Sequence, residues 1–297
     1  MTGAVGLETA HAPLGDAFPR VSGREEARAF ELDADAVARF ERDGFLTPLD
    51  VLDAEQVADL AARVDAIGED LDRHRPLLYE VERAYTERPA EVVLHYLGGW
   101  RVDERLHDLV FHPAVTVPLA QLLGVDRLRF WHDQVFHKPP RHPAPVPWHQ
   151  DWAYWTRTTP MRHVTMFVAL DDMDLDNGCL HYAPGTHRWR TLPPAPFAGD
   201  EAGVTVGFDD AERAAFAPTP SRLRAGQASV HHANTLHGSA GNRSDRPRRA
   251  LVLNYMAADT RVADDAEPLL AGAPAIAVGE VVEGAFFPVV LDQRRWT

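Results

Sequence analysis

The feature that most limits the possible folds is a change in sequence texture at Leu128. From that residue on, short runs rich in β-branched and aromatic residues alternate with connectors rich in Pro and Gly. Four of these runs lie at 128–136, 163–170, 227–237 and 250–256. Strands that follow one another in this way form sandwiches or barrels rather than doubly wound parallel sheets. The second half of the chain is therefore predicted to form an all-β core.

The first 125 residues instead predict helices, over 33–43, from 53 to 71 and over 113–123. The second of these begins at Asp53, which forms a capping-box pattern with Gln56. Its apolar residues recur every three or four positions and so form one stripe along the helix. Gly44 and Gly124 are placed to end the first and the third helix, because Gly adopts the left-handed conformation at little cost.

No linker separates the helical half from the β-rich half. We therefore expect an α+β protein in which residues 31–297 form a single domain, with the N-terminal helices packed on the β core. Residues 1–30 carry Gly, Pro, Ala and charge with no clear period, and we expect a loose arm there. The stretch 205–220 predicts an inserted loop or a short helix.

Charge and cysteine content exclude several classes of protein. The formal net charge of −14 argues against general binding to nucleic-acid phosphates, which requires a positive surface. Cys179 is the single cysteine, so no intrachain disulfide can form. No apolar run reaches the roughly 20 residues of a membrane helix, and the N-terminus lacks the pattern of a secretory signal. We expect a soluble, cytoplasmic protein that binds neither nucleic acid nor a membrane.

A His-x-Asp pair in the β-rich half is the strongest candidate for a metal site. Residues two apart in an extended chain point to the same side, so the His149 imidazole and the Asp151 carboxylate converge. With His237 as third ligand, a divalent metal would keep three positions open to reactants. A His-x-Asp pair is expected by chance in a chain with 15 His, so the pair alone is weak evidence for a metal site. The segment after His237, a turn and then an Arg that opens an apolar strand, strengthens the prediction.

Other histidines leave alternatives open for the third ligand. His231 and His232 precede His237 on what we predict to be the same strand, and His181 and His187 lie in a turn rich in Gly and Pro. Each could bind a metal in a different scheme, although packed or solvated histidines are the commoner case.

Lys138 is the single Lys among 30 basic residues. Because every other residue of this set is Arg, the Lys suggests that this position needs a compact ammonium group. A chance survivor on a loop explains the observation equally well.

Four motifs follow one another along the β-rich half. They are KPP at 138–140, WHQD at 148–151, DNGCLHYAPGTH at 176–187 and HGSxxNxSxxxRRA at 237–250. Their order and spacing resemble the phytanoyl-CoA dioxygenase family of iron(II)- and 2-oxoglutarate-dependent oxygenases. The stretch FERDGFLTPLDVLDAEQV resembles that family's opening, so the resemblance extends from about residue 33 to the end. It implies a double-stranded β-helix, a cupin-like jelly roll.

The resemblance also implies roles for single residues. The positions that match the family's iron ligands are His149, Asp151 and His237. Arg248 matches the Arg that binds the distal carboxylate of 2-oxoglutarate, which a guanidinium pairs with through two charge-assisted hydrogen bonds. Arg249 ranks second, because it would face the other side of the strand.

Further contacts to the co-substrate are predicted around Arg248. Ser239 matches a family position that touches the same carboxylate. We also place Gln134 and Lys138 near the co-substrate. Phe167 stands where some relatives carry a Trp, so that wall of the site remains aromatic.

The activity implied by the resemblance is hydroxylation of an unactivated C–H bond in a small organic substrate. Iron(II) would be the cofactor, and 2-oxoglutarate and dioxygen would be consumed. Succinate and carbon dioxide would be released. Asp151 favours oxygen chemistry, because related halogenases lack this carboxylate. Trp152, Tyr154 and Trp155 could form an aromatic substrate pocket. These aromatic candidates, together with the absence of an evident CoA-binding patch, favour a secondary metabolite as substrate.

Two rival functions use the same residues differently. A cupin-like hydrolase or isomerase would hold zinc or manganese and would not need Arg248. A non-catalytic small-molecule-binding protein would keep the barrel with a degenerate site. Metal content and succinate release distinguish the three, whereas the oligomeric state has no signature in the sequence.

Overall fold

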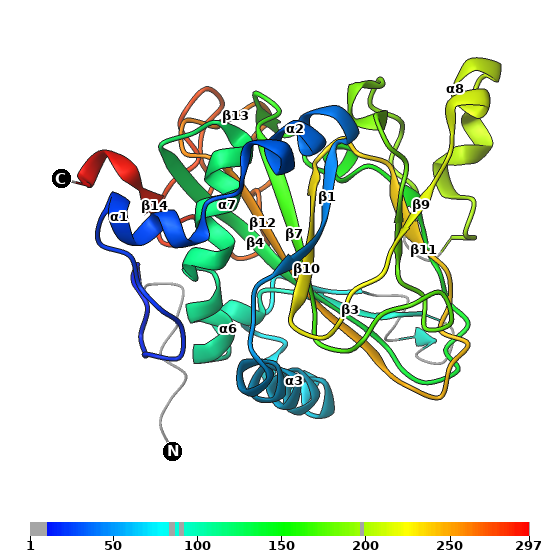
Figure 1. Cartoon of the computed structure of the whole chain (residues 1–297), viewed down its shortest axis with the longest axis horizontal. Coiled ribbons are helices and arrows are strands. Elements are labelled where there is room, and N and C mark those ends of the chain that lie inside the picture. Colours follow the sequence, from blue (N-terminus) through cyan, green and yellow to red (C-terminus); the bar gives the residue numbers. More distant parts are fainter. Residues whose placement is uncertain (1–10, 83–86, 89–91, 197–198, 297) are drawn as a thin grey trace.

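The computed structural model describes residues 11–82, 87–88, 92–196 and 199–296. Two antiparallel sheets form a double-stranded β-helix, the predicted jelly roll (Figure 1). The larger sheet has the order β1-β10-β7-β12-β4-β3-β2, with β14 paired to β4, and the smaller has the order β5-β11-β8-β9. The larger sheet contains β1 (Phe45–Asp50), β2 (Glu80–Val81), β3 (Leu94–Leu97), β4 (Arg127–Lys138), β7 (His163–Ala169), β10 (Gln227–His232), β12 (Arg248–Ala257) and β14 (Val289–Asp292).

The smaller sheet closes the barrel opposite the larger one. It contains β5 (Val146–His149), β8 (Leu180–Tyr182), β9 (Thr219–Ser221) and β11 (His237–Ser239). A separate two-stranded ribbon pairs β6 (Thr158–Thr159) with β13 (Arg261–Val262).

Helices gather mainly in the first half of the chain. The α-helices are α1 (Arg24–Ala27), α2 (Ala34–Asp43), α3 (Ala54–Glu69), α4 (Leu71–His74), α6 (Glu104–Leu109), α7 (Pro113–Leu123) and α8 (Asp210–Ala215). Short 3₁₀ turns are η2 (Arg28–Phe30), η3 (Gly99–Arg101), η4 (Asp151–Tyr154), η5 (Thr186–Arg188), η6 (Gly203–Gly207) and η7 (Gln293–Arg295). In the described part of the chain no helix is both long and apolar enough to cross a membrane.

Helix ends lie where local chemistry predicts them. The Asp53 carboxylate accepts from the Gln56 N–H, and the Gln56 side chain accepts from the Asp53 N–H, which completes the capping box of α3. Gly44 ends α2 with φ +81°, and Gly124 ends α7 with φ +63°. The predicted second helix differs in one respect, since it breaks after Glu69 and the last turn forms the separate α4.

The described part of the predicted loose arm, residues 11–30, contacts the rest of the protein at a few points. The backbone N–H groups of Leu14 and Gly15 donate to the Asp108 carboxylate at 2.7 and 2.6 Å. Phe18 is buried, with its ring centroid 5.0 Å from that of His112. The buried Phe18 ring and the Asp108 carboxylate thus connect this segment to the rest of the protein.

The hydrophobic core lies between the helices and one face of the larger sheet. Side chains alternate between the two faces of a strand. On β12, Leu251, Leu253 and Tyr255 therefore belong to the cluster that contains α3 and α7 residues such as Leu60 and Leu119. Helix α7 packs directly on β4 and β7. The opposite face of the sheet, toward the smaller sheet, is left for a site.

The predicted strand over 227–237 is in fact two strands in different sheets. Strand β10 ends at His232 in the larger sheet, and β11 begins at His237 in the smaller one. The chain turns between them, where the Thr235 N–H donates to the His232 carbonyl at 2.8 Å and the Thr235 hydroxyl donates to the Gly44 carbonyl at 2.7 Å. His231 and His232 are thus not on the strand of His237, which corrects our prediction.

Candidate metal centre

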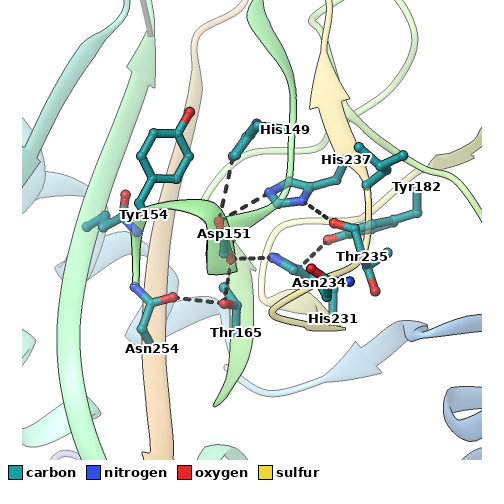
Figure 2. A network of polar contacts seen from close by, with 12 residues as sticks. His149, Asp151, Tyr154, Thr165, Tyr182, His231, Asn234, Thr235, His237 and Asn254 are labelled. Atoms are coloured by element: carbon teal, nitrogen blue, oxygen red, sulfur yellow. Dashed lines mark hydrogen bonds and ion pairs between the residues drawn. The ribbon is translucent and has the colours of Figure 1, made fainter. Parts of the chain in front are cut away.

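Three side chains predicted as metal ligands converge inside the barrel (Figure 2). His149 ends β5, Asp151 begins η4, and His237 begins β11, directly opposite His149 in the ladder. The Asp151 Oδ1 atom lies 3.6 Å from His149 Nε2 and 3.7 Å from His237 Nε2. These separations are shorter than twice a metal–ligand bond of roughly 2.0–2.2 Å, so one ion can bind all three atoms.

Backbone carbonyl groups orient both imidazole rings. His149 Nδ1 lies 2.7 Å from the Pro147 carbonyl oxygen, and His237 Nδ1 lies 3.0 Å from that of Thr235. A carbonyl oxygen only accepts, so each Nδ1 carries the proton and a neutral ring presents the Nε2 lone pair to the centre. Burial, with His149 and His231 nearby, holds the pKa of His237 well below its usual range, which keeps that ring neutral.

Asp151 is ionised, and hydrogen bonds hold one of its two carboxylate oxygens. Burial alone would raise its pKa, but His237, His149 and His231 together hold the pKa well below the usual range of a carboxyl. Its second oxygen, Oδ2, accepts from the Thr165 hydroxyl at 2.8 Å and lies 3.0 Å from His231 Nε2. Oδ1 therefore remains directed at the two histidine ligands.

The groups that hold Asp151 come from one row across the larger sheet. The ladder aligns His132, Asn254, Thr165 and His231 on adjacent strands, so all four face the interior. Thr165 Oγ1 lies 2.9 Å from Asn254 Oδ1, and Asn254 Nδ2 lies 3.2 Å from His132 Nδ1. The row forms a continuous polar network behind the carboxylate, as Figure 2 shows in part.

His231, an alternative ligand in the sequence, has a different contact in the structure. Its Nε2 faces a carboxylate, which only accepts, so that nitrogen donates to Asp151. Its Nδ1 lies 3.2 Å from the Tyr182 hydroxyl, which in turn lies 2.8 Å from Ser229 Oγ. His231 thus orients a metal ligand through a hydrogen bond.

The remaining alternative histidines lie elsewhere. His232 Nδ1 accepts from the Asn234 N–H at 3.1 Å, and its ring centroid lies 5.6 Å from that of His187. His181 is half-buried on β8, opposite Gly238.

Arg248 lines the same small cavity as the three candidate ligands. The described lining residues include His149, Asp151, His237, Gln134, Phe167, His231 and Arg248. The Arg248 side chain is fully buried, and none of its three guanidinium nitrogens has a hydrogen-bond partner among the described residues. Burial lowers its pKa to about 10, so the group stays charged at neutral pH. A buried, unpaired cation is costly unless an anion binds it.

The other predicted co-substrate residues divide into two groups. Gln134 and Phe167 line the small cavity, and the Arg248 guanidinium carbon lies 4.9 Å from the Phe167 ring centroid. Lys138 and Ser239 are not among the described residues that line the small cavity. Lys138 Nζ instead donates to Ser239 Oγ at 2.8 Å and to the Ala240 carbonyl at 2.5 Å. The buried Lys138 amino group thus stabilises the turn after β11, and burial together with the nearby Arg248 lowers its pKa well below the usual range.

A second, larger cavity of about 310 Å³ opens beside His149 and Asp151. Tyr154 and Trp155 line it, as predicted for a substrate pocket. Trp152, predicted with them, is not among the described residues that line either cavity. Its ring lies 5.3 Å from that of His163 and packs against the main core, because the 3₁₀ turn η4 rotates consecutive side chains to different sides.

Sequence reasoning missed several residues that the site uses. Thr165 and Asn254 hold Asp151, but nothing in their own segments indicates a function. A two-residue period counted from Phe167 and from Arg248 would have placed both on the inner face. The cross-strand alignment that brings them together depends on register, which the local sequence does not reveal.

Known proteins resemble this chain in sequence and in fold. The family model described as phytanoyl-CoA dioxygenase (PhyH) matches residues 40–250. The ectoine dioxygenase of Nocardia farcinica (strain IFM 10152) is 27% identical over 259 residues, which are 82% of this chain and 83% of that protein. A probable alpha-ketoglutarate-dependent hypophosphite dioxygenase of Stutzerimonas stutzeri is 31% identical over 159 residues, about half of either chain (52% and 54%).

A solved structure adds a likeness in fold. It is that of the epimerase SnoN in complex with Fe³⁺, alpha ketoglutarate and nogalamycin RO. The TM-score is 0.70 at 25% sequence identity, with 86% of this chain and 97% of that chain covered.

Proposed function

Because the chain belongs to the phytanoyl-CoA dioxygenase family, we propose that His149, Asp151 and His237 bind its iron(II) and that Arg248 binds 2-oxoglutarate. The protein is a non-haem iron(II)- and 2-oxoglutarate-dependent dioxygenase. The reaction proposed for it is hydroxylation of an unactivated C–H bond in a small organic substrate. The single observation that carries the assignment is the buried Arg248 guanidinium, which lines the same cavity as the triad and has no hydrogen-bond partner among the described residues.

The donor set fits iron(II). Two neutral imidazoles and one carboxylate on one side of an ion are the ligands that non-haem iron oxygenases use, with the remaining positions open. The small cavity joins this set to an unsatisfied guanidinium, which fits a dicarboxylate bound at one end by the metal and at the other by Arg248. When they are bound, iron(II) and 2-oxoglutarate together with dioxygen would supply the oxidising power for C–H hydroxylation. The 2-oxoglutarate would be converted to succinate and carbon dioxide.

The chain's own residues position and shield the reaction. Thr165 and His231 keep the Asp151 carboxylate turned toward the metal, and the two carbonyl contacts keep both imidazoles in the ligating tautomer. Phe167 covers one side of the Arg248 guanidinium and limits the access of water to it. The large cavity holds the substrate beside His149 and Asp151, and the substrate itself does not bind the metal.

The proposed substrate is a secondary metabolite. Aromatic residues of the large cavity, among them Trp131, Tyr154 and Trp155, suit a ring system. The described lining residues include no Lys or Arg with which to bind the phosphates of a CoA thioester. SnoN, similar in fold, is described with nogalamycin RO bound.

We also propose a cytoplasmic location, no role for nucleic acid, and one catalytic domain over residues 31–297. The net charge of −14 disfavours contact with phosphate backbones, and the single Cys179 is buried.

An anaerobic titration tests the function. The purified, metal-free protein receives iron(II) and then 2-oxoglutarate, and the visible charge-transfer band of the bound pair is followed. On admission of air, succinate is measured. We expect a band and succinate in the wild type, an absent band in His149→Ala and His237→Ala, and a normal band in the control His232→Ala. A protein that holds zinc, shows no band and releases no succinate would favour the hydrolase or the binding protein instead.

A further inference from the structure

The charge and shape of the large cavity indicate a chemical class of substrate. Building on the proposed function, we propose that the substrate carries a basic amine on a bulky, largely apolar framework, and that Glu80 binds the ammonium group.

Glu80 lies at the open end of the large cavity. It is exposed on β2, the last strand of the larger sheet, and it lines the cavity together with Glu82. The ladder aligns Glu80 with Leu97 on β3 and Leu97 with Gln134 on β4, so the three face the same side. Gln134 lines both cavities. Two strand spacings, about 10 Å in total, therefore separate Glu80 from the entrance to the small cavity.

The electrostatics of the cavity favour a cation. Although Glu80 is exposed as a residue, partial desolvation of its carboxyl at the cavity raises its pKa, and the neighbouring Glu82 carboxylate raises it further, so a bound positive charge would relieve both effects. Arg101 contacts the wall over the Tyr79 ring at 4.9 Å but is not among the described lining residues. The described residues that line the cavity include Glu80 and Glu82 but no Lys or Arg, so an anionic substrate would meet negative charge there.

The walls suit the rest of such a molecule. Tyr79, Trp131, Tyr154 and Trp155 contribute aromatic surface, which attracts both ring systems and ammonium groups. Trp131 is 3% exposed, and its indole N–H has no hydrogen-bond partner among the described residues. A buried donor at a cavity wall calls for an acceptor. We assign to it an oxygen of the substrate framework, a carbonyl, hydroxyl or ether.

The volume agrees with a framework of this kind. The large cavity has a volume of about 310 Å³. Such a space is larger than a small inorganic anion needs and lies within the range of cavities for small organic ligands.

Binding of three matched probes tests the proposal. They are 2-naphthylmethylamine, 2-naphthylmethanol and 2-naphthoate, which share one ring system and differ in charge. Calorimetry under anaerobic conditions measures their affinities for the protein loaded with iron(II) and 2-oxoglutarate, and for the metal-free protein. We expect the amine to bind about tenfold more tightly than the alcohol, and the carboxylate most weakly.

Two variants of Glu80 and one control assign the preference to this residue. Glu80→Gln should remove the advantage of the amine and leave the affinity for the alcohol within about twofold. Glu80→Arg should reverse the order and favour 2-naphthoate. Glu25→Gln, at an exposed position on α1 outside the cavity, should change nothing. Thermal unfolding of each variant checks that the fold is intact.

The outcomes separate this proposal from the function on which it rests. An iron–2-oxoglutarate band and succinate formation with no preference for the amine overturn the substrate class alone. The substrate class is also overturned if Glu80→Gln keeps the preference, or if none of the three probes binds. An absent band overturns the proposed function, whereas the preference measured in the metal-free protein still decides the role of Glu80.

Discussion

On strand β12, Arg248 and Arg249 are neighbours in the chain but lie on opposite faces of the larger sheet. Arg249 has its guanidinium nitrogens 2.6 Å from Asp65 and 2.7 Å from Asp171. Arg248 faces the barrel interior, fully buried and without a hydrogen-bond partner among the described residues. The outer face thus satisfies its charge within the chain, whereas the inner face leaves a charge for a ligand.

The same contrast holds along the rest of the sheet. The outer face packs apolar side chains against helices, as Leu251 and Leu253 do. The inner face carries Asn254, Thr165 and His231 around the metal site. Burial serves stability on one face and the orientation of polar groups on the other, so changes to the two faces should affect different measurements.

The largest effect is expected from removal of the inner carboxylate. Asp151→Ala should lower succinate formation by more than about a hundredfold, because it removes a metal ligand, while partners of ligands alone contribute roughly 10–100-fold. The control Asp171→Asn, on the outer face, should leave the rate within about twofold and lower the unfolding temperature. Equal rates in wild type and Asp151→Ala would remove Asp151 from the metal site.

The paired arginines should separate affinity from stability. Arg248→Ala should raise the KM for 2-oxoglutarate by at least about thirtyfold, since truncation of one partner of a buried charge pair costs roughly 2–5 kcal/mol. It should not destabilise the metal-free protein, because it removes a buried charge without a partner. Arg249→Ala should leave the KM unchanged and lower the free energy of unfolding by about 1–2 kcal/mol, as its ion pairs are partly exposed. The interpretation fails if the two variants change the same measurement.

A third test compares adjacent apolar residues. Leu253→Ala, on the helix-covered face, should lower the free energy of unfolding by about 2–5 kcal/mol and leave the KM for 2-oxoglutarate unchanged. Val252→Ala, which lines the small cavity, should cost about 1–2 kcal/mol and raise that KM. Denaturant unfolding and steady-state kinetics give both numbers for each variant.

A smaller effect than the loss of Asp151 itself is expected at the residue that orients Asp151. His231→Phe should weaken iron(II) binding by roughly 10–100-fold, because Asp151 loses one of its two hydrogen-bond donors. His231→Gln, which can still donate, should recover part of the affinity. His232→Phe serves as control on the adjacent residue. If His231→Phe binds iron(II) as tightly as the wild type, His231 contributes only to packing and does not orient Asp151.

Local features of the sequence determined the ends of the helices and the metal triad. Asp53 with Gln56, Gly44 and Gly124 each act through backbone groups within a few residues, so their effect is visible without the fold. The pair His149 and Asp151 was predictable for the same reason. His237 was predictable as the third ligand because it begins a motif of consecutive residues, 237–250.

Tertiary structure alone decided the rest, because register and sheet assignment depend on contacts between residues far apart in sequence. It placed His231 and His237 in different sheets and turned Trp152 away from the cavity. It also left Arg248 without a hydrogen-bond partner among the described residues, beside the paired Arg249. It also anchored Phe18 and the residues around it, which composition indicated to be loose. The sequence thus determined which groups could bind a metal, and the pairing of distant strands decided which side chains hold them in position.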